Sequence, residues 1–199
     1  LNWAYNYNGA ANLDDEGALG MPSIDGRIYV TGESNESVAA DQDGILISMN
    51  KNGTTNWTYN YNNAADSVDF FNTFVQNPAD SNLYVLGGTT NAQGNMDFMV
   101  ICLNRNGQQQ WIYTYNGPGN GKDYGGYIMT MGQDGNIYCP AEITNASGNE
   151  DFCIISLTPA GNFRWIYTLS GTANINDGCL AVFSGPDGNI YATGMTNGL

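Results

Sequence analysis

The sequence predicts an all-β protein, a β-propeller built from four-stranded antiparallel blades. The chain repeats itself every 54 residues, each period holds four short apolar runs, and Asp-Gly, Asn-Gly and similar turns separate these runs. Glycine is abundant, with 26 among 199 residues. No stretch has the 3.6-residue apolar periodicity over eleven or more positions that would indicate a helix.

The tryptophans define the period, since the four are spaced 54 residues apart: Trp3, Trp57, Trp111 and Trp165. An aspartate series keeps the same interval: Asp15, Asp69, Asp123 and Asp177. The chain therefore holds about 3.7 repeats of a closed ring or of a larger array.

The four runs of a period predict strands a to d, ordered outward from the channel of the propeller. We expect a single partial propeller over residues 1-199, with an isolated d strand at 1-7, blades at 17-61, 70-115 and 125-169, and a partial blade at 179-194. The isolated d strand is expected to complete the closing blade. The dipeptides Asp25-Gly26 and Asn52-Gly53 predict type I′ hairpin turns, whose two central residues both take positive φ.

Long loops and tight turns are expected on opposite faces of this propeller. The d-to-a and b-to-c loops emerge together and carry most of the 19 acidic side chains, whereas the hairpin turns emerge on the other face. Binding is expected on the acidic long-loop face, because recognition residues concentrate in loops held by a rigid scaffold.

One period carries a family resemblance. From Asp97 to Tyr138 it has an Asp-led apolar strand, a glycine turn, an aromatic strand, an acidic Gly-rich loop and a Gly-Asn-hydrophobic-Tyr strand. This order resembles the bacterial β-propeller repeat often called SBBP. The family's Thr-Gly ending is present at Thr31-Gly32 but is replaced by Pro140-Ala141. The resemblance implies large secreted or surface proteins of prokaryotes and no shared catalytic residues.

The aspartate series precedes strand a, where side chains of successive blades converge on the mouth of the channel. A ring of these four carboxylates is a candidate ligand site and a candidate Ca²⁺ site, because Ca²⁺ takes oxygen ligands. The alternative, which we favour, is that each aspartate accepts backbone N–H bonds within its own turn. A residue that recurs in every blade is first a structural requirement.

The aromatic residues divide into two groups. The four tryptophans lie mid-strand and are expected to pack between adjacent sheets instead of stacking on sugars. Phe71 and Tyr124 lie at the entrance to strand a and are better candidates for a carbohydrate platform.

The cysteines are expected to be buried free thiols that act as small apolar side chains: Cys102, Cys139, Cys153 and Cys179. A disulfide between Cys139 and Cys153 is the alternative. The absence of histidine and of CxxC spacing argues against a zinc site.

Composition limits the function. A net charge of −14 repels nucleic acids and anionic lipid surfaces, and no apolar run reaches the roughly 20 residues needed for membrane insertion. No catalytic constellation is recognisable, so an enzyme is not predicted. We expect a secreted or cell-surface propeller that mediates protein assembly or adhesion, through a protein partner or self-assembly. The alternatives are a glycan-binding propeller that uses the acidic loops and, less favoured, a carboxylate-based glycosidase or lyase.

Overall fold

The computed structural model describes residues 3–36 and 42–198, and this part of the chain is all-β, with fifteen strands and no helix. The first sheet contains β1 (Glu16–Pro22), β2 (Ile28–Ser34), β3 (Asp43–Met49) and β4 (Thr55–Tyr61). The second contains β5 (Asp69–Gln76), β6 (Leu83–Thr90), β7 (Met96–Leu103) and β8 (Gln109–Tyr115). The third contains β9 (Tyr124–Gly125), β10 (Thr130–Met131), β11 (Ile137–Thr144), β12 (Glu150–Leu157) and β13 (Phe163–Leu169), and the last pairs β14 (Gly178–Ser184) with β15 (Ile190–Met195).

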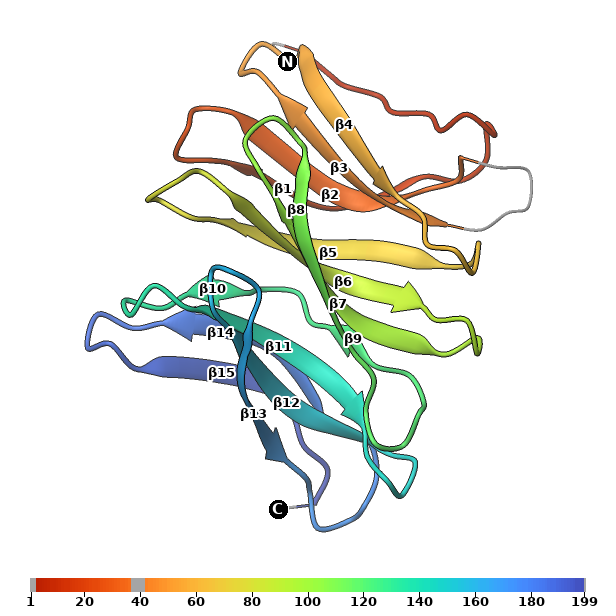
Figure 1. The fold of residues 1–199 in the computed structure, drawn as a ribbon, viewed down its shortest axis with the longest axis vertical. Helices are drawn as coiled ribbons and strands as arrows, with labels where there is room; N and C mark the ends of the chain where they lie inside the picture. The colour runs from red at the N-terminus through yellow and green to blue at the C-terminus, as the bar shows by residue number, and fades with distance from the viewer. Residues whose placement is uncertain (1–2, 37–41, 199) are drawn as a thin grey trace.

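The strands of each sheet are antiparallel and follow one another in chain order. The four sheets lie one after another along the molecule, from β1–β4 near the N-terminus to β14–β15 near the C-terminus (Figure 1). Each sheet begins and ends within one residue of the expected set of strands. The described residues form an open series of sheets and do not close a ring.

The core lies between consecutive sheets. Val85 and Met99 of the second sheet pack against Leu46 of the first, in a cluster that also includes Phe71 and Phe74. The opposite face of the second sheet contributes to a further cluster with the third. Strands β6 and β7 therefore read as nearly continuous apolar runs, because both of their faces are buried. The outer strands β4 and β8 alternate between exposed and half-buried residues.

The hairpin turns differ from the expected type I′ geometry. In the first hairpin, Gly26 N–H donates to the Ser23 carbonyl at 3.0 Å and Ser23 N–H donates to the Arg27 carbonyl at 2.8 Å. Gly26 takes a φ of +81°, whereas Asp25 stays at negative φ and accepts the Arg27 N–H through its side chain. This is a type I turn followed by a glycine bulge, in which only one residue needs positive φ. The Asn52-Gly53 turn has the same bonds and a φ of +86° at its glycine.

The inner strand of the third sheet is broken, where a continuous strand starting at 125 was expected. Glu16 and Met21 are five positions apart in the first sheet, but their counterparts Tyr124 and Thr130 are six positions apart, so the third period has one extra residue there. The neighbouring Pro140 accepts from the Gly126 N–H but has no N–H to offer that strand. The strand therefore splits into β9 and β10.

The segment between β9 and β10 pairs with the next sheet. Tyr127 N–H donates to the Leu180 carbonyl at 2.8 Å, and Val182 N–H donates to the Ile128 carbonyl at 2.8 Å. Ile128 and Ala181 form a parallel bridge. The third and last sheets are thus joined by backbone hydrogen bonds as well as by side-chain packing.

The N-terminal segment does not form the expected d strand. Residues 1–2 lie outside the described residues, and residues 3–7 belong to no sheet. No c strand lies beside them in the described part of the chain, so their backbone has no ladder to join. Tyr7 nevertheless packs against the first sheet, in the cluster that contains Ile45, Ile47 and Met49.

No described segment is a helix long and apolar enough to cross a membrane.

Candidate functional site

The recurring aspartates tie each d-to-a loop to the end of the following strand b. Asp123 accepts the Gly117 N–H at 2.5 Å through one oxygen and the Thr144 N–H at 2.6 Å through the other. The same pair of backbone donors recurs at Asp15 (Gly9 and Asn35), Asp69 (Asn63 and Thr90) and Asp177 (Gly171 and Asn197). This geometry matches the turn-capping role.

The structure leaves the calcium site a prediction. The four aspartates use their oxygens within their own periods and do not converge on one point. Within residues 3–36 and 42–198, no three acidic or cysteine side chains form a group that could hold a metal ion.

Burial and hydrogen bonding act in opposite directions on these carboxyl groups. Burial raises the pKa of Asp123, against the lowering effect of its bonds from Gly117 and Thr144. In the last period, the hydrogen bond from the Gly171 N–H is the main reason that the pKa of Asp177 is lowered. We call this pair of backbone hydrogen bonds to one aspartate the aspartate clamp. The charged form is favoured at Asp177, near the end of the chain, whereas the neutral form is favoured at Asp123, near its middle.

The tryptophans lie at the junctions between sheets. The Trp57 indole N–H donates to the Arg105 carbonyl at 3.0 Å, and its ring covers Gly107, where an added Cβ would lie 2.7 Å from the ring. Trp3 and Trp111 make the same contacts, with the Lys51 carbonyl and Gly53 and with the Pro159 carbonyl and Gly161. Each covered glycine has positive φ, so both its conformation and its missing side chain are required.

Among the residues that the structure describes, no such hairpin covers the fourth tryptophan. Trp165 is 37% exposed and Tyr167 is 52% exposed. With Ile154, Ile166 and Ile190 these side chains line an open apolar hollow over the third and last sheets. We call these five residues the Trp165 face.

The cysteines are free and buried, and Cys139 and Cys153 are not joined. In the ladder between β11 and β12, Cys139 lies opposite Ile155, whereas Cys153 lies opposite Ala141, so the two thiols are offset by two residues. Burial raises the pKa of Cys102 and Cys179 to about 12. Such thiols are poor nucleophiles.

The two expected carbohydrate platforms have other contacts. Phe71 is 1% exposed and belongs to the core, where its ring lies near those of Tyr59 and Tyr61, so it has no free face for a sugar. Tyr124 is half-buried and donates to Glu142 at 2.7 Å. The Lys122 ammonium lies 4.5 Å from the centre of the Tyr124 ring. The pKa of the Tyr124 hydroxyl is raised by burial and by Glu142.

A pair of glutamates at the inner edge of the first sheet differs from its counterparts in the other periods. Glu16 in β1 lies directly opposite Glu33 in β2. The matching pairs are Phe70 with Gly88, Tyr124 with Glu142, and Gly178 with Met195. Like charges opposite one another destabilise an antiparallel pair. The aspartates were identified because they recur in every period. The Glu16–Glu33 pair could have been identified by pairing residues across the first predicted hairpin.

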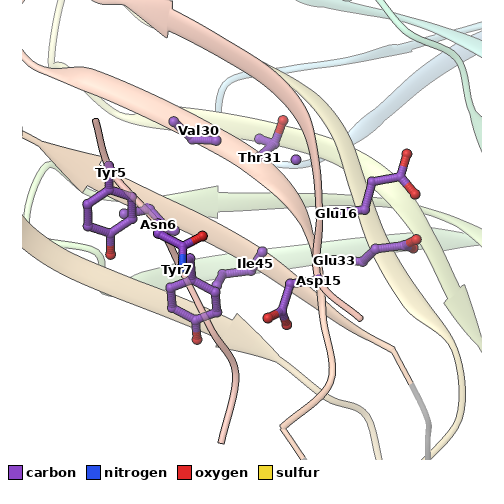
Figure 2. Close-up of a pocket in the computed structure, with 11 residues that line it drawn as sticks. Tyr5, Asn6, Tyr7, Asp15, Glu16, Val30, Thr31, Glu33 and Ile45 are labelled. Atoms are coloured by element: carbon purple, nitrogen blue, oxygen red, sulfur yellow. The ribbon is translucent and has the colours of Figure 1, made fainter. Parts of the chain in front are cut away.

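Two cavities meet at this pair. One, of about 250 Å³, lies between the N-terminal segment and the first sheet and includes Tyr5 and Tyr7 in its lining. Figure 2 shows Glu16 and Glu33 extending from neighbouring strands with their carboxylates on the same side, away from Tyr5 and Tyr7. The other cavity, of about 320 Å³, shares both glutamates and is lined further by Phe70, Phe71, Asn72 and Tyr127, among others.

Burial is the largest influence on Glu33 and raises its pKa. The Glu16 carboxylate raises this pKa further, and a hydrogen bond of 2.9 Å from the Gln42 side chain opposes the shift. Glu33 is thus held beside a like charge in a partly desolvated position.

The similarity of this chain to known proteins concerns its fold alone. No protein-family model and no curated protein matches this chain. A crystal structure of a protein of unknown function from Bacteroides caccae is similar to it, with a TM-score of 0.54 and 12% sequence identity. The similarity covers 88% of this chain and 52% of that one, so the chain spans about half the length of that protein. The relation to the SBBP repeat stays a prediction.

Proposed function

We propose that this chain is a non-catalytic, secreted or cell-surface assembly module of the β-propeller type, which joins a protein partner through the Trp165 face. The observation that carries this proposal is the contrast among four equivalent tryptophans. Trp3, Trp57 and Trp111 are each covered by a glycine hairpin, whereas Trp165 is exposed. An exposed apolar hollow beside the edge of a sheet is a common kind of interaction site.

The three covered junctions define the partner that the Trp165 face would accept. In each, a β-hairpin places a positive-φ glycine under the indole ring and a backbone carbonyl at the indole N–H. Strand β15 pairs with β14 on one side, and its other side is available for a further strand. A hairpin that adds to β15 would therefore both continue the sheet and cover Trp165. This mode of binding is β-strand addition.

A peptide spanning residues 43–61, the hairpin of β3 and β4, tests this role. It should bind the intact chain, as measured by isothermal titration calorimetry, and the Trp165→Ala variant should bind it at least about tenfold more weakly because the central aromatic contact is lost. The matched control on the chain is Ile24→Ser, which removes an apolar side chain that is 65% exposed on a hairpin turn. This variant should bind normally.

A second peptide carries Gly53→Ala and serves as the matched control for the ligand. Its added Cβ would collide with an indole ring at the covered junction, so its binding should be weaker than that of the parent peptide. Equal binding of both peptides, or unchanged binding by Trp165→Ala, would count decisively against assembly through this face.

A further inference from the structure

The Glu16–Glu33 pair places two acidic groups where the fold does not require them. The other three periods form the same strand pair with at most one carboxylate, and that one, Glu142, accepts a hydrogen bond from Tyr124. The first sheet thus keeps a destabilising like-charge pair. Residues that reduce stability in this way are characteristic of functional positions.

The charges near the pair leave its repulsion in place. The influences on Glu33 are burial, the Glu16 carboxylate and the Gln42 amide. The ion pairs found among the described residues join Arg27 and Arg105 to Asp25, and Arg164 to Asp134, at the hairpin turns. A cation that entered beside Glu16 and Glu33 would relieve the repulsion.

The cavity beside the pair has the size and lining of a small-molecule site. Its volume of about 320 Å³ lies at the lower end of the range for ligand pockets. Phe70 and Tyr127 contribute aromatic rings, and Tyr127 is 60% exposed. Asn72 donates its side-chain N–H to the Gly125 carbonyl at 2.9 Å, which holds the second and third sheets together at this wall.

We propose that this cavity binds a small organic ammonium ion, with its charged nitrogen between Glu16 and Glu33 and its carbon atoms against Phe70 and Tyr127. Carboxylates attract an ammonium group, and aromatic rings offer apolar surface to the carbon atoms attached to it. A calcium ion needs six to eight oxygen ligands, more than two carboxylates supply. A neutral sugar would leave the like-charge repulsion unrelieved.

The test uses n-butylammonium as the probe and the whole chain as the receptor, with binding followed by NMR chemical shifts. We expect saturable shifts at Tyr127 and at the Glu33 carboxyl, and weaker binding at higher salt. The neutral analogue n-butanol should produce no saturable shifts. The Glu33→Gln variant should lose affinity at least about tenfold, since one of two charged partners is removed.

The controls separate this site from a general effect of negative charge. Glu142→Gln alters the residue that matches Glu33 in the third period, and it should leave the affinity unchanged. Glu33→Gln removes a repulsion, so it should raise the melting temperature, and Tyr127→Ser provides a second variant at an exposed side chain. Equal binding of n-butanol, unchanged affinity in Glu33→Gln, or saturable binding of CaCl₂ but not of n-butylammonium would overturn the proposal. These measurements do not depend on the Trp165 face.

Discussion

Trp111 and Trp165 occupy the same position in consecutive sheets, yet they have different surroundings. Trp111 stacks on Gly161 of the next hairpin and donates to the Pro159 carbonyl, whereas Trp165 lies over an open hollow. Within their own sheets each ring lies 5.7 Å from a tyrosine of strand b, although the Trp111 pair is stacked and the Trp165 pair is tilted. The difference therefore comes from the hairpin of the following sheet. Such a hairpin covers Trp111, and none covers Trp165 among the described residues.

The largest effect should come from truncating these two tryptophans. Trp111→Ala should lower the free energy of unfolding by about 3 kcal/mol, because it leaves a cavity at a filled junction and removes an indole hydrogen bond. Trp165→Ala should cost about 1 kcal/mol or less, since its ring is partly in water already. Urea unfolding of both variants measures the difference. Equal losses would mean that the hairpin contact contributes little.

The glycines beneath the tryptophans sharpen the same comparison. Gly107→Ala should cost about 2 kcal/mol, because its Cβ meets the Trp57 ring and its φ is positive. Gly135→Ala is the matched control, with a φ of +75° and open space around its Cβ, and should cost about 1 kcal/mol. Thermal or urea unfolding distinguishes them. A larger loss at Gly135 would contradict a packing role for the indole ring.

The repeated sheets were predictable because their signals are local. Tryptophan spacing and hairpin glycines indicated the first and last residues of each sheet to within one residue, and the clamp role of Asp15 and its counterparts followed from their place before strand a. The broken strand at 125–130 was not predictable in the same way, since it depends on pairing with Leu180 in the next sheet. Glu16 and Glu33 were missed because recurrence identifies what the fold needs, whereas their pairing is specific to one period.

The aspartate clamps should respond differently to acid in the middle and at the end of the chain. Asp123 has a raised pKa, so its contribution is present below its unfolded pKa and is lost as pH rises through the folded value. Asp177 has a lowered pKa, so its contribution is present above its unfolded pKa and is lost as pH falls through the folded value. Each Asp→Asn change should also cost about 1 to 2 kcal/mol, because one backbone N–H loses its acceptor.

Urea unfolding between pH 3 and 6 measures these slopes, taking about pH 4 as the ordinary value for an aspartate. Asp123→Asn should lose more stability than the unmodified chain on acidification, and Asp177→Asn should lose less. Parallel pH profiles for the two variants would show that the clamps are electrostatically equivalent.

The smallest effect concerns the broken strand of the third sheet. Pro140→Thr restores a backbone N–H that faces β9 and β10, and threonine occupies the matching position at Thr31. We expect stability to change by less than about 1 kcal/mol, since the extra residue between β9 and β10 remains. Amide exchange at Tyr127 and Ile128 should stay slow if their bonds to Leu180 persist. Faster exchange there would mean that the proline maintains the link between the sheets.

Hydrogen exchange of the indole N–H groups tests the central claim most directly. Trp57 and Trp111 should exchange slowly, because their indoles donate to backbone carbonyls of the next hairpin, and Trp165 should exchange rapidly in the free chain. Addition of the 43–61 hairpin peptide should slow Trp165 alone. Slow exchange of Trp165 without the peptide, or no change when the peptide binds, would contradict the account that this face is built to receive a following hairpin.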